Sequence, residues 1–126
     1  MRLLLIEDDE SLCLSLSYQL RQDGFAPETC HDGEEGLLWA RQQGYDLILL
    51  DRMLPGMDGL KATRILREYA RFDNLPIIAM TAHAMRGDEE RSFAAGMNAH
   101  LTKPIDVREL VFSLSRWGSA ARRNRK

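Results

Sequence analysis

Short apolar runs in this chain alternate with longer segments in which apolar residues recur every three or four positions. The clearest run spans residues 47–50, where four apolar residues lead directly into Asp51. Turn residues follow it, namely Pro55, Gly56 and Gly59. A short apolar run bounded by turn residues is typical of a strand that is buried on both faces, as in a parallel sheet. The pattern therefore predicts a central strand that ends at Asp51.

Other apolar runs predict the remaining strands of the sheet. Two of them, over residues 2–6 and 76–80, resemble the central run, and a further one over residues 98–102 is less apolar. A weaker run spans residues 25–30 and contains Pro27. Because proline cannot donate a hydrogen bond to a strand ladder, Pro27 favours a position at the edge of the sheet.

Amphipathic segments between these runs predict five helices. Leu12, Leu16 and Leu20 recur every four residues, which predicts a first helix that ends near Gly24. The same criterion predicts a second helix that stops at Gly44, and further helices over residues 60–70, about 85–95 and from about 107 onwards, with a loop at 71–75. Strands that alternate with helices form βαβ units with right-handed crossovers. We therefore expect one α/β domain with a doubly wound, five-stranded parallel sheet.

The composition is that of an ordinary soluble domain and indicates neither a membrane protein nor a nucleic-acid-binding protein. The 126 residues are 44% hydrophobic and 29% charged, and the net charge is -2. These values are ordinary for a single soluble domain with a real core, and nothing global indicates nucleic acid. The first apolar run is short and is followed at once by acids, so it predicts neither a signal peptide nor a membrane span. Cys13 and Cys30 lack metal-like or redox spacing, which favours reduced, half-buried thiols in a cytoplasmic protein.

Polar side chains follow four of the predicted strands at the point where each ends. They are three acids, a hydroxyl and an ammonium: Glu7, Asp8, Asp51, Thr81 and Lys103. The carboxyl ends of parallel strands meet at one edge of a sheet, which is where ligands bind in open α/β sheets. Each residue also has a purely structural interpretation. The first two acids could stabilise the start of a helix, Asp51 could lie in a turn, Thr81 could be an N-cap, and Lys103 could be a surface lysine. The occurrence of all of them at matched strand ends favours one shared pocket.

The chemistry of such a pocket suits phosphoryl transfer. A carboxylate can attack phosphorus and form an aspartyl phosphate, and Asp51 is the proposed nucleophile. Glu7, Asp8 and Asp51 form a hard oxygen site suited to Mg²⁺, which binds few carboxylates and keeps several waters. Cations are needed because both the nucleophile and the phosphoryl group are anionic.

The order of four motifs gives this chain a family resemblance. The motifs are Leu-Leu-Ile-Glu-Asp-Asp, Leu-Asp-Arg-Met-Leu-Pro-Gly-Met-Asp-Gly, Met-Thr-Ala and Leu-Thr-Lys-Pro-Ile. In this order and spacing the chain resembles the receiver domain of two-component response regulators, from Leu3 to about Trp117. The resemblance implies a flavodoxin-like (βα)5 fold with strand order 2-1-3-4-5. It also implies a receiver domain over residues 1–118, followed by a basic tail or the start of a linker at 119–126.

The resemblance assigns a role to each residue of the pocket. It makes Asp51 the phosphoacceptor and implies Mg²⁺, or Mn²⁺ in its place, as the cofactor. The metal ligands it implies are Asp8 and Asp51 directly, Glu7 at least partly through water, and the backbone carbonyl of Met53. Lys103 would contact the phosphoryl oxygens, Thr81 would donate a hydroxyl hydrogen bond to them, and the small Ala82 would leave access for phosphate.

The resemblance also implies a function and partners. The phosphoryl group would come from a phosphohistidine on a histidine kinase or a histidine phosphotransfer protein, and the domain would then change conformation to control an output. The domain would catalyse only its own phosphorylation and dephosphorylation, although a longer parent chain could be a hybrid histidine kinase. We expect no contact of this domain with nucleic acid or membrane, and a homodimer through the last two helices and the last strand is a further expectation.

Other polar residues near these motifs have less certain roles. Asp9 is predicted to be an N-cap and Asp58 a turn residue, neither of them a ligand. His31 is predicted in a surface turn, and His83 beside the mouth of the pocket. None of the histidines has a second histidine or cysteine at ligand spacing, so a zinc site is not expected. His100 occupies a position where receivers usually carry Tyr or Phe, and with Thr81 it is the predicted switch pair.

Two other functional classes compete with the receiver interpretation. Metal-dependent phosphatases of the haloacid-dehalogenase type carry a second aspartate two residues after the nucleophile, where this chain has Met53. A flavodoxin needs a phosphate-cradling loop after the first strand, but that place is acidic here. A pseudo-receiver usually lacks one of the acids, the threonine or the lysine, and all are present.

The ends of the chain leave its context open. Met1 directly before the first strand favours a native start, whereas the run from Thr81 to Met85 and the Leu-Thr-Lys-Pro-Ile motif resemble receivers attached to hybrid kinases. Four of the last five residues are basic: Arg122, Arg123, Arg125 and Lys126. A basic tail can bind nucleic acid, but a solvated end or the start of a linker is the favoured interpretation.

Overall fold

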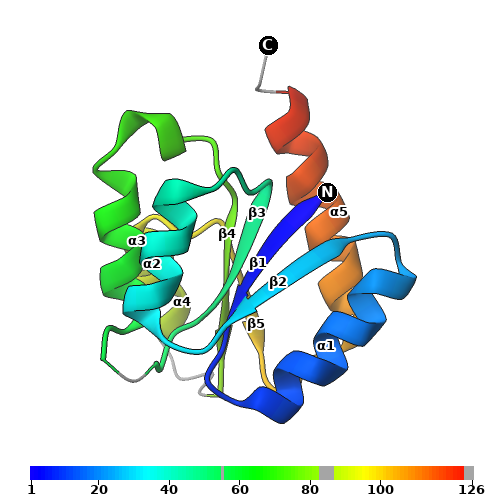
Figure 1. Ribbon diagram of the computed structural model, residues 1–126. Coiled ribbons are helices and arrows are strands. Elements are labelled where there is room, and N and C mark those ends of the chain that lie inside the picture. The colour runs from blue at the N-terminus through cyan, green and yellow to red at the C-terminus, as the bar shows by residue number, and fades with distance from the viewer. Residues whose placement is uncertain (55, 83–86, 124–126) are drawn as a thin grey trace.

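A five-stranded parallel sheet forms the centre of the molecule (Figure 1). The computed structural model describes residues 1–54, 56–82 and 87–123, with side chains as far as residue 118. The strands are β1 (Arg2–Ile6), β2 (Ala26–Cys30), β3 (Leu47–Asp51), β4 (Ile77–Thr81) and β5 (Ala99–Thr102). They lie in the order β2-β1-β3-β4-β5, and every neighbouring pair is parallel. The predicted fold, strand order and edge position of the Pro27 strand are confirmed.

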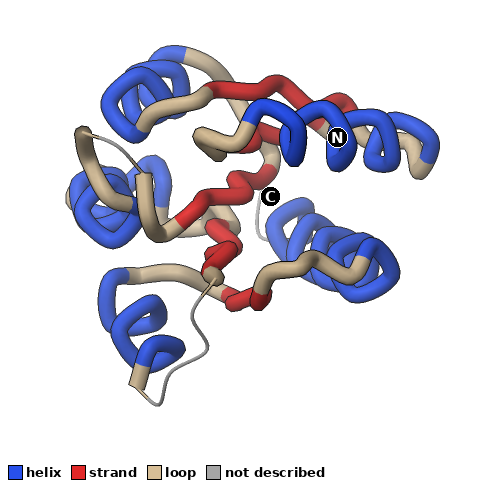
Figure 2. The backbone as a smooth tube through the Cα atoms, turned by 90° about the horizontal axis from the view of Figure 1, so that it is seen from below, coloured by secondary structure: helices blue, strands red, loops and turns tan. Residues whose placement is uncertain are grey.

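In the described part of the chain, five α-helices cover both faces of the sheet (Figure 2). They are α1 (Glu10–Gln22), α2 (Gly33–Gln42), α3 (Gly59–Arg67), α4 (Asp88–Ala95) and α5 (Val107–Arg123), and a short 3-10 turn, η1 (Ala70–Phe72), follows α3. Helices α1 and α5 lie on one face, and α2, α3 and α4 lie on the other (Figure 1). Among the described residues, none of the helices is long and apolar enough to cross a membrane.

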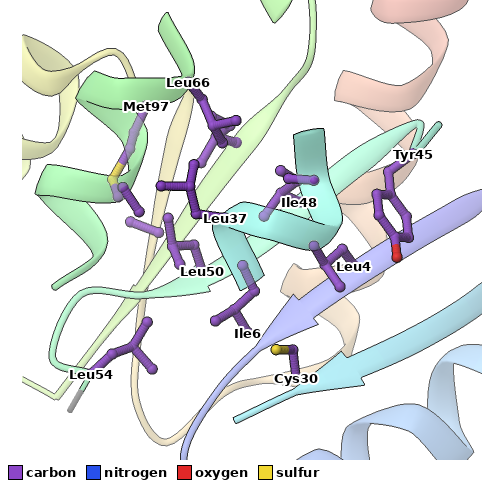
Figure 3. Close-up of a cluster of buried hydrophobic side chains, with 14 residues drawn as sticks. Leu4, Ile6, Cys30, Leu37, Tyr45, Ile48, Leu50, Leu54, Leu66 and Met97 are labelled. Carbon is purple, nitrogen blue, oxygen red and sulfur yellow. The ribbon is translucent and has the colours of Figure 1, made fainter. Parts of the chain in front are cut away.

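Alternation along the strands divides the core into two clusters. In β1, Leu3 and Leu5 face α1 and α5, while Leu4 and Ile6 face α2 and α3. The second of these clusters is shown in Figure 3, where Leu4, Ile6, Leu37 and Leu50 point toward one another. Every residue of β3 is buried, as expected for a strand with helices on both sides. Each of its leucine and isoleucine side chains contributes about 1.5–3 kcal/mol by leaving water, so β3 is a rigid support for Asp51.

Aspartate N-caps fix where α1 and α3 begin. Asp9 accepts a hydrogen bond from the Leu12 N–H at 3.1 Å, so its predicted role as an N-cap is confirmed. Asp58 accepts from the Lys61 N–H at 2.8 Å and is therefore the N-cap of α3 as well as a residue of the turn. Such caps satisfy backbone donors that the first turn leaves free.

Two helix boundaries differ from the prediction. Helix α3 ends at Arg67, and the predicted loop after it begins with η1. Tyr69, which the helical pattern includes, lies outside α3 because its ring packs edge-on against Phe72 and beneath the Arg41 guanidinium. Helix α4 begins at Asp88, while the predicted start near Met85 lies outside the described residues.

Helix α5 extends past the predicted domain end at residue 118, as far as Arg123. The division into a domain over residues 1–118 and a tail stays a prediction.

Candidate functional site

The strand register brings the predicted residues to one edge of the sheet. Ile6 pairs with Leu50, so Glu7 follows β1 at the level where Asp51 ends β3. Asp51 pairs with Met80, and Thr81 pairs with Thr102, directly before Lys103. The predicted convergence of the strand ends is therefore observed.

Lys103 joins two of the acids. Its Nζ donates to Asp51 Oδ2 at 3.0 Å and lies 2.5 Å from Glu7 Oε1. Both carboxylates are almost fully buried, at 3% exposure for Asp51 and 0% for Glu7. The Lys103 N–H donates to the Thr81 carbonyl at 2.7 Å, which anchors the lysine to the end of β4. One ammonium thus neutralises part of the charge of two buried carboxylates.

Glu7 and Lys103 both have shifted pKa values in the site. Burial raises the pKa of Glu7 from 4.5 to about 7, and the ion pair with Lys103 offsets only part of this effect. The neighbouring carboxyl groups of Asp8 and Asp51 raise it further. Burial alone would lower the pKa of Lys103, but Glu7 and Asp51 outweigh burial and raise it. Lys103 therefore stays charged, while Glu7 is only partly ionised at neutral pH.

The acidic cluster has the properties of a divalent cation site. One carboxylate oxygen each from Glu7, Asp8 and Asp51 lies within 4.8 Å of the others. Asp8 is exposed, so the cluster is open to solvent on one side. Glu7 Oε1 is buried, and the Lys103 ammonium lies 2.5 Å from it. Carboxylate oxygens are hard donors, and a cluster of them that is open to water on one side fits Mg²⁺.

The loop after β3 holds Asp51 in place. The Met53 N–H donates to Asp51 Oδ1 at 2.9 Å, while the Met53 side chain is 65% exposed. Gly59 is essential for the path of this loop, because a Cβ atom there would lie 2.5 Å from the Asp51 carbonyl oxygen. The Gly59 N–H donates to the Arg52 carbonyl at 3.1 Å, so the start of α3 packs directly on the loop.

Thr81, Ala82 and His100 are the other predicted site residues that the structure describes. Thr81 is 2% exposed at the end of β4, beside β3, and Ala82 is exposed. His83 lies outside the described residues. His100 is half-buried on β5, and its Nδ1 lies 3.3 Å from Ser92 Oγ of α4. Burial is the main cause that lowers the pKa of His100, so a neutral ring is favoured.

His31 and the cysteines have contacts that the sequence did not predict. His31 is on the surface, as expected, but its Nδ1 lies 3.0 Å from the Glu7 carbonyl oxygen. Cys13 Sγ lies 3.3 Å from the same oxygen and 3.8 Å from His31 Nδ1. Both cysteines are free and fully buried, not half-buried, and burial raises the pKa of Cys13 to about 12 and that of Cys30 to about 11. Protonated thiols are poor metal ligands, so the Cys13–His31 contact gives no support to a zinc site.

Arg52 is the residue near the site that sequence reasoning missed. It directly follows Asp51, and only 8% of it is exposed. Its guanidinium reaches the first residue of α4, Asp88, which forms an ion pair with it at 3.4 Å. An arginine after an aspartate in a turn motif gives no sequence signal for burial, because charged residues are rarely buried unless paired.

Comparison with known proteins agrees with this geometry. The model of the response regulator receiver domain family matches residues 3–115. The chain belongs to this family. Its flavodoxin-like sheet is shared with a putative response regulator from Chloroflexus aurantiacus J-10-fl, which is 30% identical and superposes with a TM-score of 0.89 over 94% of this chain and 97% of that one.

Relatives of this receiver domain include both kinases and regulators. The receiver domain of the sensor histidine kinase PA1611 from Pseudomonas aeruginosa PAO1, with a magnesium ion coordinated in its active-site cleft, is 39% identical over 94% of this chain and 97% of that one, with a TM-score of 0.86. The uncharacterized transcriptional regulatory protein YkoG from Bacillus subtilis (strain 168) is 37% identical over 97% of this chain and 51% of its own length. The sensor protein GacS from Pseudomonas syringae pv. syringae is 34% identical over 98% of this chain and 14% of its own length. The chain thus spans about half of the regulatory protein and a small part of the sensor protein.

Proposed function

We propose that this receiver domain takes a phosphoryl group onto Asp51 in a Mg²⁺-dependent reaction. The donor is a phosphohistidine on a histidine kinase or a histidine phosphotransfer protein. The phosphorus–nitrogen bond breaks, its electron pair stays on the imidazole, and a bond forms between phosphorus and an Asp51 carboxylate oxygen. The observation that carries the proposal is the Lys103 ammonium, which contacts both Asp51 and the fully buried Glu7 at the end of the sheet.

The positions of the side chains support these roles. Asp51 stands on the fully buried β3, and the Met53 N–H fixes one of its oxygens, so its carboxylate is held in one orientation. Lys103 is close enough to neutralise charge on a phosphoryl group attached to that carboxylate, and Thr81 lies on the neighbouring strand with its hydroxyl as a further donor. Such positioning and charge stabilisation are the main needs of phosphoryl transfer.

The acids would hold the metal. Glu7, Asp8, Asp51 and the Met53 carbonyl are the proposed ligands, with Mg²⁺ preferred and Mn²⁺ able to replace it. Bound there, the ion would supply positive charge to the phosphoryl oxygens. Three carboxylates and one ammonium leave the site anionic without it, which explains why an anionic phosphoryl group should need the metal. Ala82 is small and exposed, so the approach to Asp51 is not blocked by its side chain.

The relatives suggest the biological setting. The similarity of this chain to the receiver domain of a sensor histidine kinase and to a transcriptional regulatory protein supports a histidine kinase or phosphotransfer protein as partner. In this proposal the domain catalyses only the gain and loss of its own phosphoryl group. Its two free buried thiols suit the reducing cytoplasm, and α4, β5 and α5 would form the face of a homodimer.

The proposed output is a conformational switch through Thr81 and His100. A phosphoryl group adds about −1.5 to −2 charge and strong acceptor oxygens. Thr81 would move toward these oxygens, and His100 would follow into the space beneath α4. The half-buried ring of His100, already near Ser92 of α4, supports this coupling between β5 and α4.

Beryllofluoride, a mimic of the aspartyl phosphate, tests the proposal. NMR spectra recorded with Mg²⁺ should show new signals for residues of the site when beryllofluoride is added, and no change without Mg²⁺. Asp51→Asn should lose the response. Asp46→Asn, which changes an aspartate at the opposite end of β3, should keep it. An equal response of the Asp51→Asn protein would show that the anion binds elsewhere.

A further inference from the structure

A buried polar network links the end of β3 to α4 and β5. The Arg52 side chain is 9% exposed, and its Nη1 lies 3.2 Å from the Asp88 carbonyl oxygen and 3.4 Å from Asp88 Oδ1. Ser92 Oγ donates to the same carbonyl oxygen at 3.2 Å and lies 3.3 Å from His100 Nδ1. The network therefore begins one residue after Asp51 and ends on the strand that carries the predicted switch residue.

The Arg52 guanidinium is held loosely for a buried cation. Its two contacts with Asp88 are at the long end of hydrogen-bond and ion-pair distances, and its buried Nε has no hydrogen-bond partner among the described residues. Arg67 offers a comparison in the same molecule. All three of its nitrogens donate, to the carbonyls of Gly96 and Phe72 and to Asn98 Oδ1. Arg67 therefore has the full set of contacts of a structural arginine, whereas Arg52 leaves one donor without a partner within the described part of the chain.

A change of charge at Asp51 would act on this pair from the adjacent residue of the chain. A phosphoryl group on the adjacent residue adds about −1.5 to −2 charge, and it competes with Asp88 for the same guanidinium. A ligand shifts a conformational equilibrium only if it interacts differently with the two states. Attraction between the new anion and Arg52 supplies this difference, because it weakens the hold of Arg52 on Asp88.

We propose that Arg52 is a positioning residue that holds the first turn of α4 through Asp88 in the resting state, and that this ion pair opens when Asp51 is phosphorylated. The proposal rests on the proposed function of Asp51 and adds the regulation of that site. The opening would free the start of α4, which carries Ser92 and its contact to His100. Arg52 thus couples the charge of the site to the position of a helix.

Substitution of Asp88 gives the sharpest test, because it removes the resting partner and keeps the Arg52 charge. Asp88→Asn should bind beryllofluoride, at fixed Mg²⁺, at least about fivefold more tightly than the wild type, as expected for a coupling between sites. Its affinity for Mg²⁺ alone should not change. Arg91→Gln is the matched control, since Arg91 is the solvent-exposed partner of the same carboxylate, at 4.0 Å. It should change the affinity by less than about twofold, because exposed ion pairs contribute little.

A double-mutant cycle shows whether Asp88 acts through Arg52. In an Arg52→Gln background, Asp88→Asn should change the beryllofluoride affinity by less than about twofold. An equal gain in both backgrounds, or no gain in Asp88→Asn, would overturn the proposal. Loss of Mg²⁺-dependent beryllofluoride binding in the wild type would instead overturn the proposed function beneath it.

If Asp88→Asn does not fold, hydrogen exchange of the wild type tests whether the first turn of α4 is released. The Arg91 N–H donates to the Gly87 carbonyl at 3.1 Å, so it reports on the first turn of α4. With Mg²⁺ present, this amide should exchange faster when beryllofluoride is bound than in the resting protein. An unchanged or slower exchange would show that the first turn of α4 is not released.

Discussion

Without Mg²⁺, the stability of this receiver domain should depend on pH through one buried carboxyl group, Glu7. Burial raises its pKa from 4.5 to about 7 in the folded protein. Between these values the folded state binds more protons than the unfolded state, so the free energy of unfolding should fall as the pH rises. The loss should begin near pH 4.5 and be complete slightly above pH 7.

The size of the effect follows from the difference between the two pKa values. One pKa unit corresponds to about 1.36 kcal/mol, so a rise from 4.5 to about 7 costs about 3 kcal/mol of stability once Glu7 is ionised. This is a large part of the roughly 5–15 kcal/mol that stabilises a typical domain. Mg²⁺ should remove most of the loss, because the ion binds the ionised carboxylates of the folded state only.

Urea unfolding at a series of pH values from 4.5 to 8, with EDTA or with Mg²⁺, measures this directly. The wild type in EDTA should lose stability across this range, whereas Glu7→Gln should lack the loss because its amide does not titrate. Glu34→Gln is the control, since Glu34 is an exposed acid in the first turn of α2. It should keep the wild-type dependence.

The reasoning would be refuted if Glu7→Gln and the wild type lost the same stability in EDTA. Another group would then carry the pH dependence. His100 cannot replace Glu7 in this role, because its lowered pKa has the opposite effect. The unfolded chain binds more protons at His100 below about pH 6.5, so this histidine makes the folded state less stable as the pH falls.

Three further predictions concern the metal, the switch and the loop. Mg²⁺ should raise the melting temperature of the wild type, and Asp8→Ala should lose this response; an unchanged rise would place the ion at another site. NMR titration of the His100 ring should give a pKa below 6.5 that falls further when beryllofluoride is bound, whereas identical curves would exclude His100 from the switch. Gly59→Ala should lower the free energy of unfolding by about 1–3 kcal/mol and weaken beryllofluoride binding, because its Cβ would push on the Asp51 carbonyl; a wild-type urea midpoint and affinity would show that the loop can adapt.

The sequence predicts the sheet and the position of the site because both depend on local patterns. Strands β1, β3 and β4 contain continuous apolar runs, β5 is shorter and contains His100, and parallel strands bring their carboxyl ends together whatever the details of packing. Glu7, Asp51 and Lys103 are therefore found at one edge by topology alone. The end of α3 could not be predicted in this way, because Tyr69 continues the helical spacing while its ring packs between Arg41 and Phe72.

Contacts between residues that are far apart in the sequence cannot be predicted from local sequence patterns. The raised pKa of Glu7 depends on its complete burial beneath residues of other strands, and the contact of His31 with the Glu7 carbonyl joins residues 24 positions apart. Arg52 and Asp88 are 36 positions apart and belong to a turn and a helix start. Nothing in their local sequence distinguishes them from surface charges, so their pairing requires the three-dimensional structure.

Phosphorylation at Asp51 is the central claim, and one measurement tests it most directly. Wild-type protein and Asp51→Asn are incubated with acetyl phosphate and Mg²⁺, and intact mass and peptide mapping locate the phosphoryl group. The wild type should gain one phosphoryl group, labile to hydroxylamine, on the peptide that contains Asp51, whereas Asp51→Asn should keep its fold and gain none. A hydroxylamine-labile phosphoryl group on Asp51→Asn would contradict the account, because the nucleophile would then be another residue.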